Sequence, residues 1–237
     1  MNKTKSYLFD VDGVLCNRGE PISIDFKNYL LEFLKDKEYF LVTGSDREKA
    51  TSQIGSELIE NASVTFFCMG NVIYIDQQEI FINKLVLHDD EIQWLEDKIN
   101  NSRFDTKLGN HIVNRKGTVS FSVLGRPADK TQRERYIKYD DLTNERFNIA
   151  TELMKEFPRL EAFIGGDTSI DICCRGANKR QIMQFVSRSD NQLLFFTDRY
   201  DAKKLHIDSP LVPCIEPHCL HKIDNGYQQT WEILKKI

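Results

Sequence analysis

A short hydrophobic strand that runs directly into two aspartates is the feature that most limits what this chain can form. Residues 7–9 read as a buried strand, and Asp10, Asp12 and Gly13 follow it. Residues i and i+2 of an extended chain point the same way, so both carboxylates face one space beyond the strand, where Gly13 lets the chain turn. Two close carboxylates favour a shared proton or a hard cation such as Mg²⁺. A solvated turn is the alternative, which the position after an opening hydrophobic strand disfavours.

This first strand begins a regular alternation of strands and helices. Apolar residues at helical spacing predict helices over 26–34 and 46–58, and short apolar runs predict strands over 39–42 and 64–68. This order with short links implies parallel strands and right-handed crossovers. Ligands of such sheets bind at the carboxyl ends of the strands, where the acid-bearing turns fall.

The middle of the chain has a different pattern. It contains a predicted helix over 92–99, a hairpin around 115–118, a charged stretch over 126–142, a helix over 147–157 and a second hairpin over 160–174. Two hairpins with helices between them indicate an antiparallel sheet. The segment is therefore predicted to form a separate α+β unit.

The strand–helix pattern returns in the last quarter of the chain. It predicts a helix over 178–188, strands over 193–196 and 211–215, and a final helix over 227–234. The whole pattern predicts an α/β fold with a Rossmann-like, doubly wound parallel-sheet core and an inserted α+β cap. The core is predicted to comprise residues 1–82 and 186–237, and the cap residues 83–185.

The composition excludes several classes of protein. The 237 residues are 41% apolar and 29% charged, which allows a packed core and excludes a disordered chain. The net charge of -4 disfavours a nucleic-acid-binding surface, and no run approaches the roughly 20 apolar residues of a membrane span. The first residues reach Asp10 before any stretch long enough for a signal peptide, and the six cysteines lack disulfide-framework spacing. We therefore expect a reduced, cytoplasmic protein that binds neither nucleic acid nor membrane.

The first motif and several later ones together resemble a known family. Residues 9–15 are similar to the first motif of the haloacid-dehalogenase superfamily of phosphotransferases, and the order of motifs over nearly the whole chain resembles the eukaryotic-type phosphomannomutases. The matching segments are Phe9 to Leu15, Gly44-Ser45-Asp46 with Glu48-Lys49, Arg115-x-Gly117, Leu124-Gly125-Arg126, Gln132-x-Glu134-Arg135, Ile164-Gly165-Gly166-x-x-Ser169-x-Asp171, Lys179-Arg180 and Phe195-Phe196-x-Asp198.

The resemblance implies a role for each residue of the first motif. Asp10 would be the nucleophile that forms an aspartyl-phosphate, and Asp12 would protonate the leaving oxygen. Mg²⁺ would be held by Asp10, by Asp12 through its carbonyl, and by Asp198. Lys179 opens a predicted helix, where the helix dipole opposes a cation, and such a broken local rule favours a functional role over a surface lysine. Its role would be to neutralise Asp10 and the transferring phosphoryl group.

The turn after the second strand is the predicted phosphate-binding site. It opens a helix, whose free N–H groups suit a phosphate. Ser45 with Glu48 fits a capping box, which would occupy the serine hydroxyl. Thr43 is then the better phosphate ligand, although phosphomannomutases usually have glycine there, and Ser45 remains the second candidate.

Four residues of the predicted cap match the family's substrate site. Ser169 and Asp171 alternate with isoleucines, so they share one face of a strand, and a hydroxyl with an acid suits sugar hydroxyls. By resemblance they bind the hexose. Arg115 and Arg126 lie at predicted strand ends, and an arginine fork binds phosphate with two hydrogen bonds. Solvated arginines are the alternative, but the resemblance implies that they bind the distal phosphate.

The chain departs from the family around the predicted metal site. After Asp198 the family has a glycine-rich segment ending in Asn-Asp, whereas this chain has Leu-His at 205–206. An acid near the metal is therefore missing, unless Asp201 or Asp208 substitutes for it. Thr197 also replaces the family's glycine before Asp198. These changes predict weaker metal binding.

Two further departures lie elsewhere. Leu108 stands where a cap arginine is expected, so the distal phosphate site has lost one partner. This loss disfavours mutase activity. Residues 69–71 replace the family's Glu-Asn-Gly, and this change has no functional interpretation.

Four metal-ligand residue types also occur close together near the C-terminus. They are Cys214, His218, Cys219 and His221. Zinc binding is one interpretation. A core cysteine among loop residues is the preferred one, because Cys214 ends a predicted core strand and adjacent His-Cys is not a usual zinc motif.

The sequence thus supports three functional hypotheses. The leading one is a Mg²⁺-dependent phosphotransferase acting on hexose phosphates, most simply a phosphomannomutase that converts mannose 6-phosphate to mannose 1-phosphate with a hexose bisphosphate as activator. The second is a sugar-phosphate phosphatase with the same nucleophile. The third is a non-catalytic member of the family. A homodimer formed through the cap is a further expectation from the resemblance.

Overall fold

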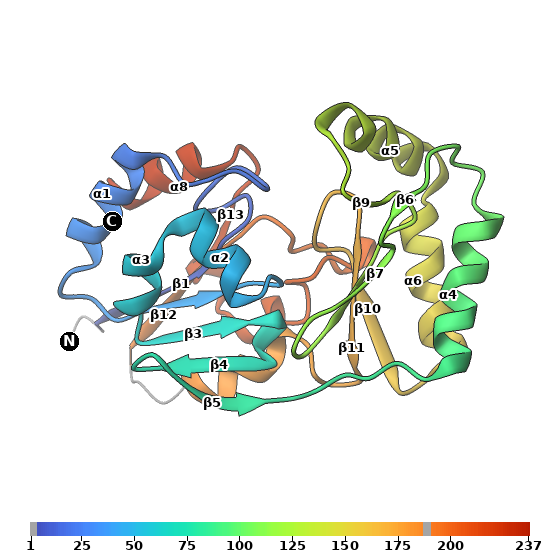
Figure 1. The fold of residues 1–237 in the computed structure, drawn as a ribbon. Helices are drawn as coiled ribbons and strands as arrows, with labels where there is room; N and C mark the ends of the chain where they lie inside the picture. Colours follow the sequence, from blue (N-terminus) through green and yellow to red (C-terminus); the bar gives the residue numbers. More distant parts are fainter. Residues whose placement is uncertain (1–3, 187–190) are drawn as a thin grey trace.

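The first sheet contains seven strands and forms the larger lobe of the molecule (Figure 1). The computed structural model describes residues 4–186 and 191–237. The strand order is β13-β12-β1-β2-β3-β4-β5; pairs from β13 to β3 are parallel, and β3-β4-β5 are antiparallel. These parallel strands confirm the predicted α/β class. The strands are β1 (Lys5–Asp10), β2 (Tyr39–Val42), β3 (Val64–Phe67), β4 (Val72–Ile75), β5 (Gln78–Ile82), β12 (Gln192–Thr197) and β13 (Leu220–Lys222).

Helices pack on this sheet through apolar faces. In α1, Phe26, Leu30 and Leu34 are buried, and Ser23 caps the helix by accepting from Phe26 N. Phe26 stacks on Trp231 of α8 at 5.3 Å between ring centroids, so the two helices lie side by side (Figure 1). The helices of this lobe are α1 (Ile24–Leu34), α2 (Arg47–Ile54), α3 (Ser56–Glu60), α7 (Met183–Val186) and α8 (Tyr227–Leu234), with the 3₁₀ turn η2 (Lys179–Ile182) before α7.

The second lobe is the antiparallel unit predicted for the middle of the chain. Its four-stranded sheet has the order β10-β11-β8-β7, and every pair in it is antiparallel. Two short parallel strands, β6 and β9, lie beside it, and α4 and α6 lie along one side of it with α5 at its end (Figure 1). The elements are α4 (Asp89–Asn101), β6 (Leu108–Gly109), β7 (Ile112–Asn114), β8 (Val119–Phe121), β9 (Gly125–Arg126), α5 (Lys130–Thr143), α6 (Glu145–Glu156), β10 (Leu160–Phe163) and β11 (Ile170–Cys174).

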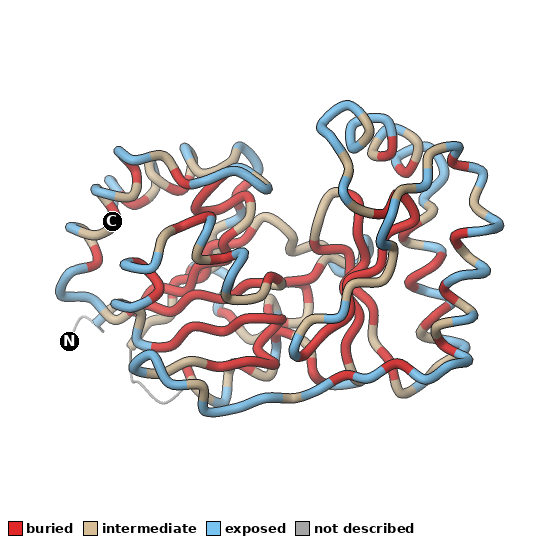
Figure 2. The backbone as a smooth tube through the Cα atoms, viewed as in Figure 1, coloured by how far each residue is buried: buried red, intermediate tan, exposed pale blue. Residues whose placement is uncertain are grey.

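Each lobe has its own hydrophobic core. Figure 2 shows burial concentrated in the strands of both sheets and on the inner sides of the helices. One cluster contains Phe9 and Phe196 of the first sheet, and the other contains Phe121 and Ile172 of the second. Ile182, which lies before the predicted core limit at 186, packs in the first cluster. The numerical domain limits stay a prediction.

The predicted strand over 211–215 is wrong. Residues Val212–Cys214 form a 3₁₀ turn, and the strand that completes the sheet is β13. Pro213 has no N–H for a ladder hydrogen bond, and the buried Leu211 and Ile215 are four residues apart, as on one face of a helical turn.

Helix limits also differ from the predictions. The charged stretch over 126–142 is largely the helix α5, which starts with a capping box at Asp129 and has only two buried residues, so it lacked an apolar stripe. The helix predicted over 46–58 is broken at Gly55, whose φ is 82°. The helix predicted over 178–188 is η2 followed by α7, and its last two residues lie outside the described part of the chain. Strands β4 and β5 had not been predicted.

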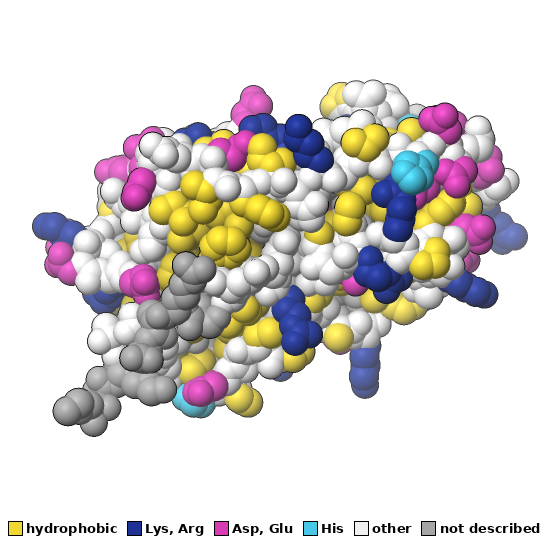
Figure 3. All heavy atoms as spheres, turned by 90° about the horizontal axis from the view of Figure 1, so that it is seen from below, with side chains coloured by type: hydrophobic (Ala, Val, Ile, Leu, Met, Phe, Trp, Pro, Cys, Tyr) yellow, Lys and Arg dark blue, Asp and Glu magenta, His cyan; other side chains and the backbone are white. Residues whose placement is uncertain are grey.

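The surface shows mixed charge. Seen from below, basic and acidic side chains are dispersed over the face, with an apolar area on the larger lobe (Figure 3). Of the helices within 4–186 and 191–237, none is both long and apolar enough to cross a membrane.

Candidate active site

The first motif forms a tight turn at the carboxyl end of β1. Asp10 is the last residue of the strand, and the turn continues through Gly13, whose φ of 84° favours glycine. A Cβ atom at Gly13 would lie 2.2 Å from Oδ2 of Asp198. Glycine is therefore required here both by the backbone and by the approach of the Asp198 carboxylate.

A fully buried lysine lies against this turn. Lys179 Nζ donates to Asp10 Oδ1 at 2.7 Å and also contacts Oδ1 of Asp208. Asp208 in turn accepts from Thr197 Oγ1 at 2.7 Å. Burial alone would lower the pKa of Lys179, but the two aspartates raise it, so the ammonium stays charged. The structure thus brings Lys179 to Asp10, as its predicted neutralising role requires.

Three aspartates form a carboxylate cluster: the buried Asp10 and Asp208 and the half-buried Asp198, each offering an oxygen within 4.8 Å of the others. Their near neighbours Lys179 and Arg18 carry two positive charges against three negative ones. Burial raises the pKa of Asp10 to about 7 despite Lys179, and that of Asp198 to about 6 despite Arg18.

The carboxylate cluster fits a hard divalent cation. Oδ1 of Asp198 is buried and has no hydrogen-bond partner among the described residues, as expected of an atom left for a ligand. Donors that are all oxygen suit Mg²⁺. The Asp12 carboxylate is not part of the cluster, and the predicted role of its carbonyl stays a prediction.

The loop after β12 decides which acid joins the carboxylate cluster. Asp201 caps a 3₁₀ turn by accepting from Lys203 N at 2.9 Å, so its side chain is engaged locally. The chain then returns past Ile164, and Asp208 N donates to the Arg199 carbonyl at 3.0 Å. Asp208, and not Asp201, therefore occupies the position near the predicted metal site that the sequence left open.

Asp12 has separate partners. Gln53 Nε2 donates to Oδ1 at 2.8 Å, and Lys49 Nζ lies 3.5 Å from Oδ2. Burial raises the pKa of Asp12, but Lys49, Gln53, Arg18 and the Gly19 N–H together outweigh it and lower the pKa below the usual range. Asp12 is thus ionised at neutral pH, the form that accepts a proton from an attacking hydroxyl.

The second turn differs from the sequence prediction at its helix cap. The N-cap of α2 is Asp46, which accepts from Lys49 N at 2.9 Å, so the predicted capping box at Ser45 is wrong. Asp46 is one residue closer to the helix and takes that role. The Ser45 hydroxyl is instead 3.0 Å from Lys49 Nζ, and Thr43 Oγ1 accepts from Ser45 N at 3.0 Å. Both residues line the cavity described next.

A cavity of about 690 Å³ lies between the carboxyl end of the first sheet and the second lobe. All nine residues predicted as catalytic, phosphate-binding or substrate-binding line this catalytic cavity. They are Asp10, Asp12, Thr43, Ser45, Arg115, Arg126, Ser169, Asp171 and Lys179. Residues from two lobes thus meet at one space, although their roles remain predictions.

The cap wall of the catalytic cavity is basic. Arg115 donates to Asp171 Oδ1 at 3.0 Å and to the Gly44 carbonyl at 2.7 Å, and Arg126 donates to Ser120 Oγ at 2.9 Å. Burial and the nearby Arg115 lower the pKa of Arg126, so an anion there would be stabilising.

Three further basic residues at the cavity were missed from the sequence. Lys130 and Arg133 of α5 line it, and their signal was the charged stretch after Arg126. Arg18 contacts the Asp198 carboxylate and donates to the Gly165 carbonyl at 2.8 Å, which connects the two lobes. No sequence signal singled out Arg18, since it lies in an irregular loop.

The structure does not assemble the four-residue zinc candidate. Glu216, His218 and Cys219 offer atoms within 4.8 Å of one another, but Cys214 and His221 are not in that group. His221 instead stacks on Phe196 at 4.5 Å between ring centroids. The preferred interpretation of these residues as structural agrees with this arrangement.

The fold and the catalytic cavity together define a haloacid-dehalogenase-type enzyme, and solved structures support that class at the level of fold. The trehalose-6-phosphate phosphatase C-terminal domain of C. albicans matches with a TM-score of 0.65 and 14% identity over 99% of this chain and 92% of that chain. An IMP-bound IMP-nucleotidase of Plasmodium falciparum matches with a TM-score of 0.66 and 17% identity over 98% and 68%. A haloacid dehalogenase-like hydrolase of Bacteroides thetaiotaomicron has a TM-score of 0.58 and 12% identity over 98% and 100%.

Sequence comparison identifies the family within that class. The family model described as eukaryotic phosphomannomutase matches residues 26–204. A phosphomannomutase of Arabidopsis thaliana is 28% identical over 81% of each chain, and one of Galdieria sulphuraria is 31% identical over 76% of this chain and 74% of its own. The chain belongs to the eukaryotic phosphomannomutase family and is an enzyme of that type.

Proposed function

We propose that the protein is a Mg²⁺-dependent phosphotransferase that interconverts mannose 6-phosphate and mannose 1-phosphate through an aspartyl-phosphate. One observation carries this proposal. Asp10, paired with the buried Lys179, faces the basic cap wall across a single cavity. A mutase needs one phosphate site at the nucleophile and a second at a distance, and this cavity offers both.

The proposed chemistry uses Asp10 and Asp12 in turn. A carboxylate oxygen of Asp10 attacks the phosphorus of a hexose bisphosphate, the Asp10–phosphorus bond forms, and the bond from phosphorus to the sugar oxygen breaks. Asp12 gives the departing sugar oxygen the proton that it took from an attacking sugar hydroxyl in the other half of the cycle. In the reverse half, ionised Asp12 takes the proton of the attacking sugar hydroxyl, the phosphoryl group moves to that oxygen, and Asp10 is restored.

The carboxylate cluster would hold Mg²⁺ through Asp10, Asp198 and Asp208. A bound Mg²⁺ would supply positive charge that offsets the charge gathered during phosphoryl transfer. Lys179 donates to Asp10, lowers the pKa of this carboxyl against the effect of burial, and holds it in place. Thr43 and Ser45 would donate to the transferring phosphate from the second turn.

The distal phosphate would bind the cap wall. Arg115 and Arg126 were predicted for this role, and Lys130 and Arg133 add two charges from α5. Leu108, which replaces an expected arginine, packs against the cap core, so it offers no charge. Ser169 and Asp171 would bind hydroxyls of the hexose between the two phosphates. Four basic side chains outweigh the loss at Leu108, which favours a mutase.

A turnover assay tests this proposal. Mannose 1-phosphate and Mg²⁺ are supplied with and without a hexose 1,6-bisphosphate, and mannose 6-phosphate and free phosphate are both measured. We expect mannose 6-phosphate that depends on the bisphosphate, little free phosphate, and no product from Asp10→Asn. Product from Asp10→Asn would contradict the mechanism.

A sugar-phosphate phosphatase is the second candidate. It is favoured by the loss of one cap charge at Leu108, since a hydrolase needs no distal phosphate site. Free phosphate without the isomer would support it. In that case Arg126→Ala should reduce hydrolysis of hexose phosphate and of a small aryl phosphate equally, whereas a mutase should lose mainly the bisphosphate-dependent reaction.

The cellular location and the oligomeric state of the protein are also proposals. A cytoplasmic location is supported by the six cysteines, all of which are free. A homodimer through the cap stays an expectation from the family, and its test is the mass of the protein in solution.

A further inference from the structure

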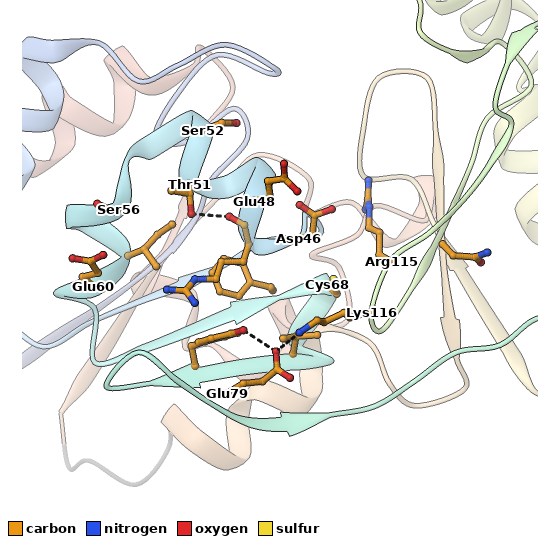
Figure 4. Close-up of a pocket in the computed structure, with 16 residues that line it drawn as sticks. Asp46, Glu48, Thr51, Ser52, Ser56, Glu60, Cys68, Glu79, Arg115 and Lys116 are labelled. Atoms are coloured by element: carbon orange, nitrogen blue, oxygen red, sulfur yellow. Dashed lines mark hydrogen bonds and ion pairs between the residues drawn. The ribbon is translucent and has the colours of Figure 1, made fainter.

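A second cavity lies on the other side of α2 from the catalytic cavity. Its volume is about 830 Å³, and it is bounded by α2, α3, β3, β4 and the turn formed by residues 114–116 (Figure 4). Small-molecule sites usually span about 300–1,000 Å³. The catalytic proposal uses none of its lining residues except Arg115. This space, called the α2 cavity below, is large enough for a ligand of its own.

The floor of the α2 cavity is apolar and aromatic. Ile59, Phe67, Val72 and Tyr74 line it. The Tyr74 ring packs edge-on against Phe67 at 5.6 Å between centroids, and the Arg47 guanidinium lies over it at 4.5 Å. Tyr74 therefore already accepts a cation beside its ring. The floor is thus compatible with an apolar group that lies next to a positive charge.

The cations at the α2 cavity are already partnered. Lys116 Nζ donates to Glu79 at 2.7 Å, Arg115 Nη1 donates to Asp171 at 3.0 Å, and Arg47 donates to Gln77 at 3.0 Å. No other Lys or Arg lines the cavity among the described residues. An anionic ligand would therefore find only one positive charge there without an acidic partner, that of Arg47, whose guanidinium donates to a neutral amide.

Acidic side chains at the α2 cavity are in excess. Once Glu79 is assigned to Lys116, Asp46, Glu48 and Glu60 remain, and the only cation without an acidic partner is Arg47. Figure 4 shows Asp46 and Glu48 along α2 and Glu60 on α3, around the same space. The charge of the α2 cavity is opposite to that of the basic cap wall, so the two cavities select different ligands.

We infer that the α2 cavity binds a small organic cation, namely a molecule with an apolar or aromatic body and one ammonium group. The body would lie on the floor around Tyr74, and the ammonium would face Glu48 and Glu60. Residues 114–116 belong to the cap and α2 to the core, so the cavity itself is lined by both lobes. The inference goes beyond the proposed function and does not depend on it.

Calorimetric titration of the full chain tests the charge selection. The probes are 2-phenylethylamine, a cation, and 3-phenylpropionate, an anion with a similar body. We expect saturable 1:1 binding of the amine and at least about 10-fold weaker binding of the acid, because the acid would face unpaired carboxylates. Equal binding of the two probes, or no saturable binding of the amine, would overturn the inference.

Three variants locate the binding. The double substitution Glu48→Gln, Glu60→Gln should weaken amine binding about 10-fold, and Thr51→Trp, which fills the cavity, should abolish it. Glu57→Gln is the matched control, since Glu57 lies on α3, pairs with Lys27 and does not line the cavity. Unchanged amine binding in both test variants would place the amine elsewhere and overturn the inference. Glu48 and Glu60 are exposed, so the double variant should fold normally. If Thr51→Trp fails to fold, the double variant alone decides the test.

Discussion

At the scale of single residues, the site depends on how buried charges are partnered. Lys179 is completely buried, and so is Asp208, and their contact completes a chain of polar groups from Thr197 to Asp10. A buried ion pair is weak evidence of stability by itself, but removing one member leaves an uncompensated charge. The lysine therefore has a structural consequence that can be measured apart from catalysis.

Lys179→Met should remove turnover and lower the free energy of unfolding by about 3–5 kcal/mol, since it leaves Asp10 and Asp208 buried without a cation. Urea unfolding measures the loss, which should be smaller at pH 5 than at pH 8, because Asp10, whose pKa burial raises to about 7, is protonated at pH 5. Arg180→Met is the matched control, since Arg180 is the exposed neighbour. Equal stability of the two variants would mean that the buried pair contributes little.

His221 gives a pH dependence far from the catalytic cavity. Burial against Phe196 lowers its pKa below the usual 6.5, with Lys5 adding to the effect. The unfolded chain therefore binds a proton at His221 at a higher pH than the folded chain does. The stability of the folded state consequently falls as the pH drops from about 6.5 toward the lowered pKa. His221→Gln should flatten that part of the stability profile in urea unfolding. His218→Gln, at an exposed histidine, should leave it unchanged; the opposite ranking would contradict the assignment.

At the scale of elements, a strand and the turn opposite it bring the proposed hexose site together. Ser169 and Asp171 face the catalytic cavity, while Ile170 and Ile172 pack in the cap core, as their alternation predicted. The opposing turn must then come very close. A Cβ at Gly165 would lie 2.5 Å from Oδ2 of Asp171 and 2.9 Å from Cδ1 of Ile207.

Gly165→Ala should therefore displace Asp171 and raise the KM for hexose phosphate about 10-fold, since small misplacements of a positioned group are costly. Steady-state kinetics measure the change, and kcat should fall less than KM rises. Gly176→Ala is the control for backbone strain alone: its φ is 82°, but nothing lies within 4 Å of a Cβ there and it does not line the catalytic cavity, so the KM should not change. An unchanged KM for Gly165→Ala would show that the Asp171 position does not set substrate affinity.

At the scale of the whole molecule, two cations of one turn connect the lobes. Arg115 is 8% exposed at its side chain and links Gly44 of the core to Asp171 of the cap. Lys116 is 61% exposed and pairs with Glu79 of β5. The buried Arg115–Asp171 pair should contribute more than the exposed Lys116–Glu79 pair, because solvent screens the charges of the exposed pair.

Arg115→Met should raise the KM for hexose phosphate at least about 10-fold, whereas Lys116→Met should change it less than about 2-fold. Added salt should weaken only the contribution of Lys116, which kinetics at low and high ionic strength would detect. Similar effects of both substitutions on the KM would mean that Arg115 and Lys116 contribute equally to the connection between the lobes, which would contradict a dominant role of the buried arginine.

The sequence by itself determined the class of the fold and most of the catalytic cavity. Strand–helix alternation predicted the parallel sheet, and the carboxyl ends of parallel strands meet at one edge, so Asp10, Thr43 and Ser45 had to lie together. Alternation over residues 169–172 likewise predicted which residues face the catalytic cavity. These are local patterns, which a single chain displays without reference to distant segments.

Only the tertiary structure decided which of two aspartates completes the carboxylate cluster. Asp201 and Asp208 are both in an irregular loop, and the path of that loop depends on its contact with Ile164 of the cap. The same holds for Arg18, which no local pattern distinguishes from a solvated arginine until Asp198 and Gly165 lie beside it. Periodicity specifies strands and helices, but the position of a loop side chain is set by long-range packing, and that information is spread over segments far apart in the sequence.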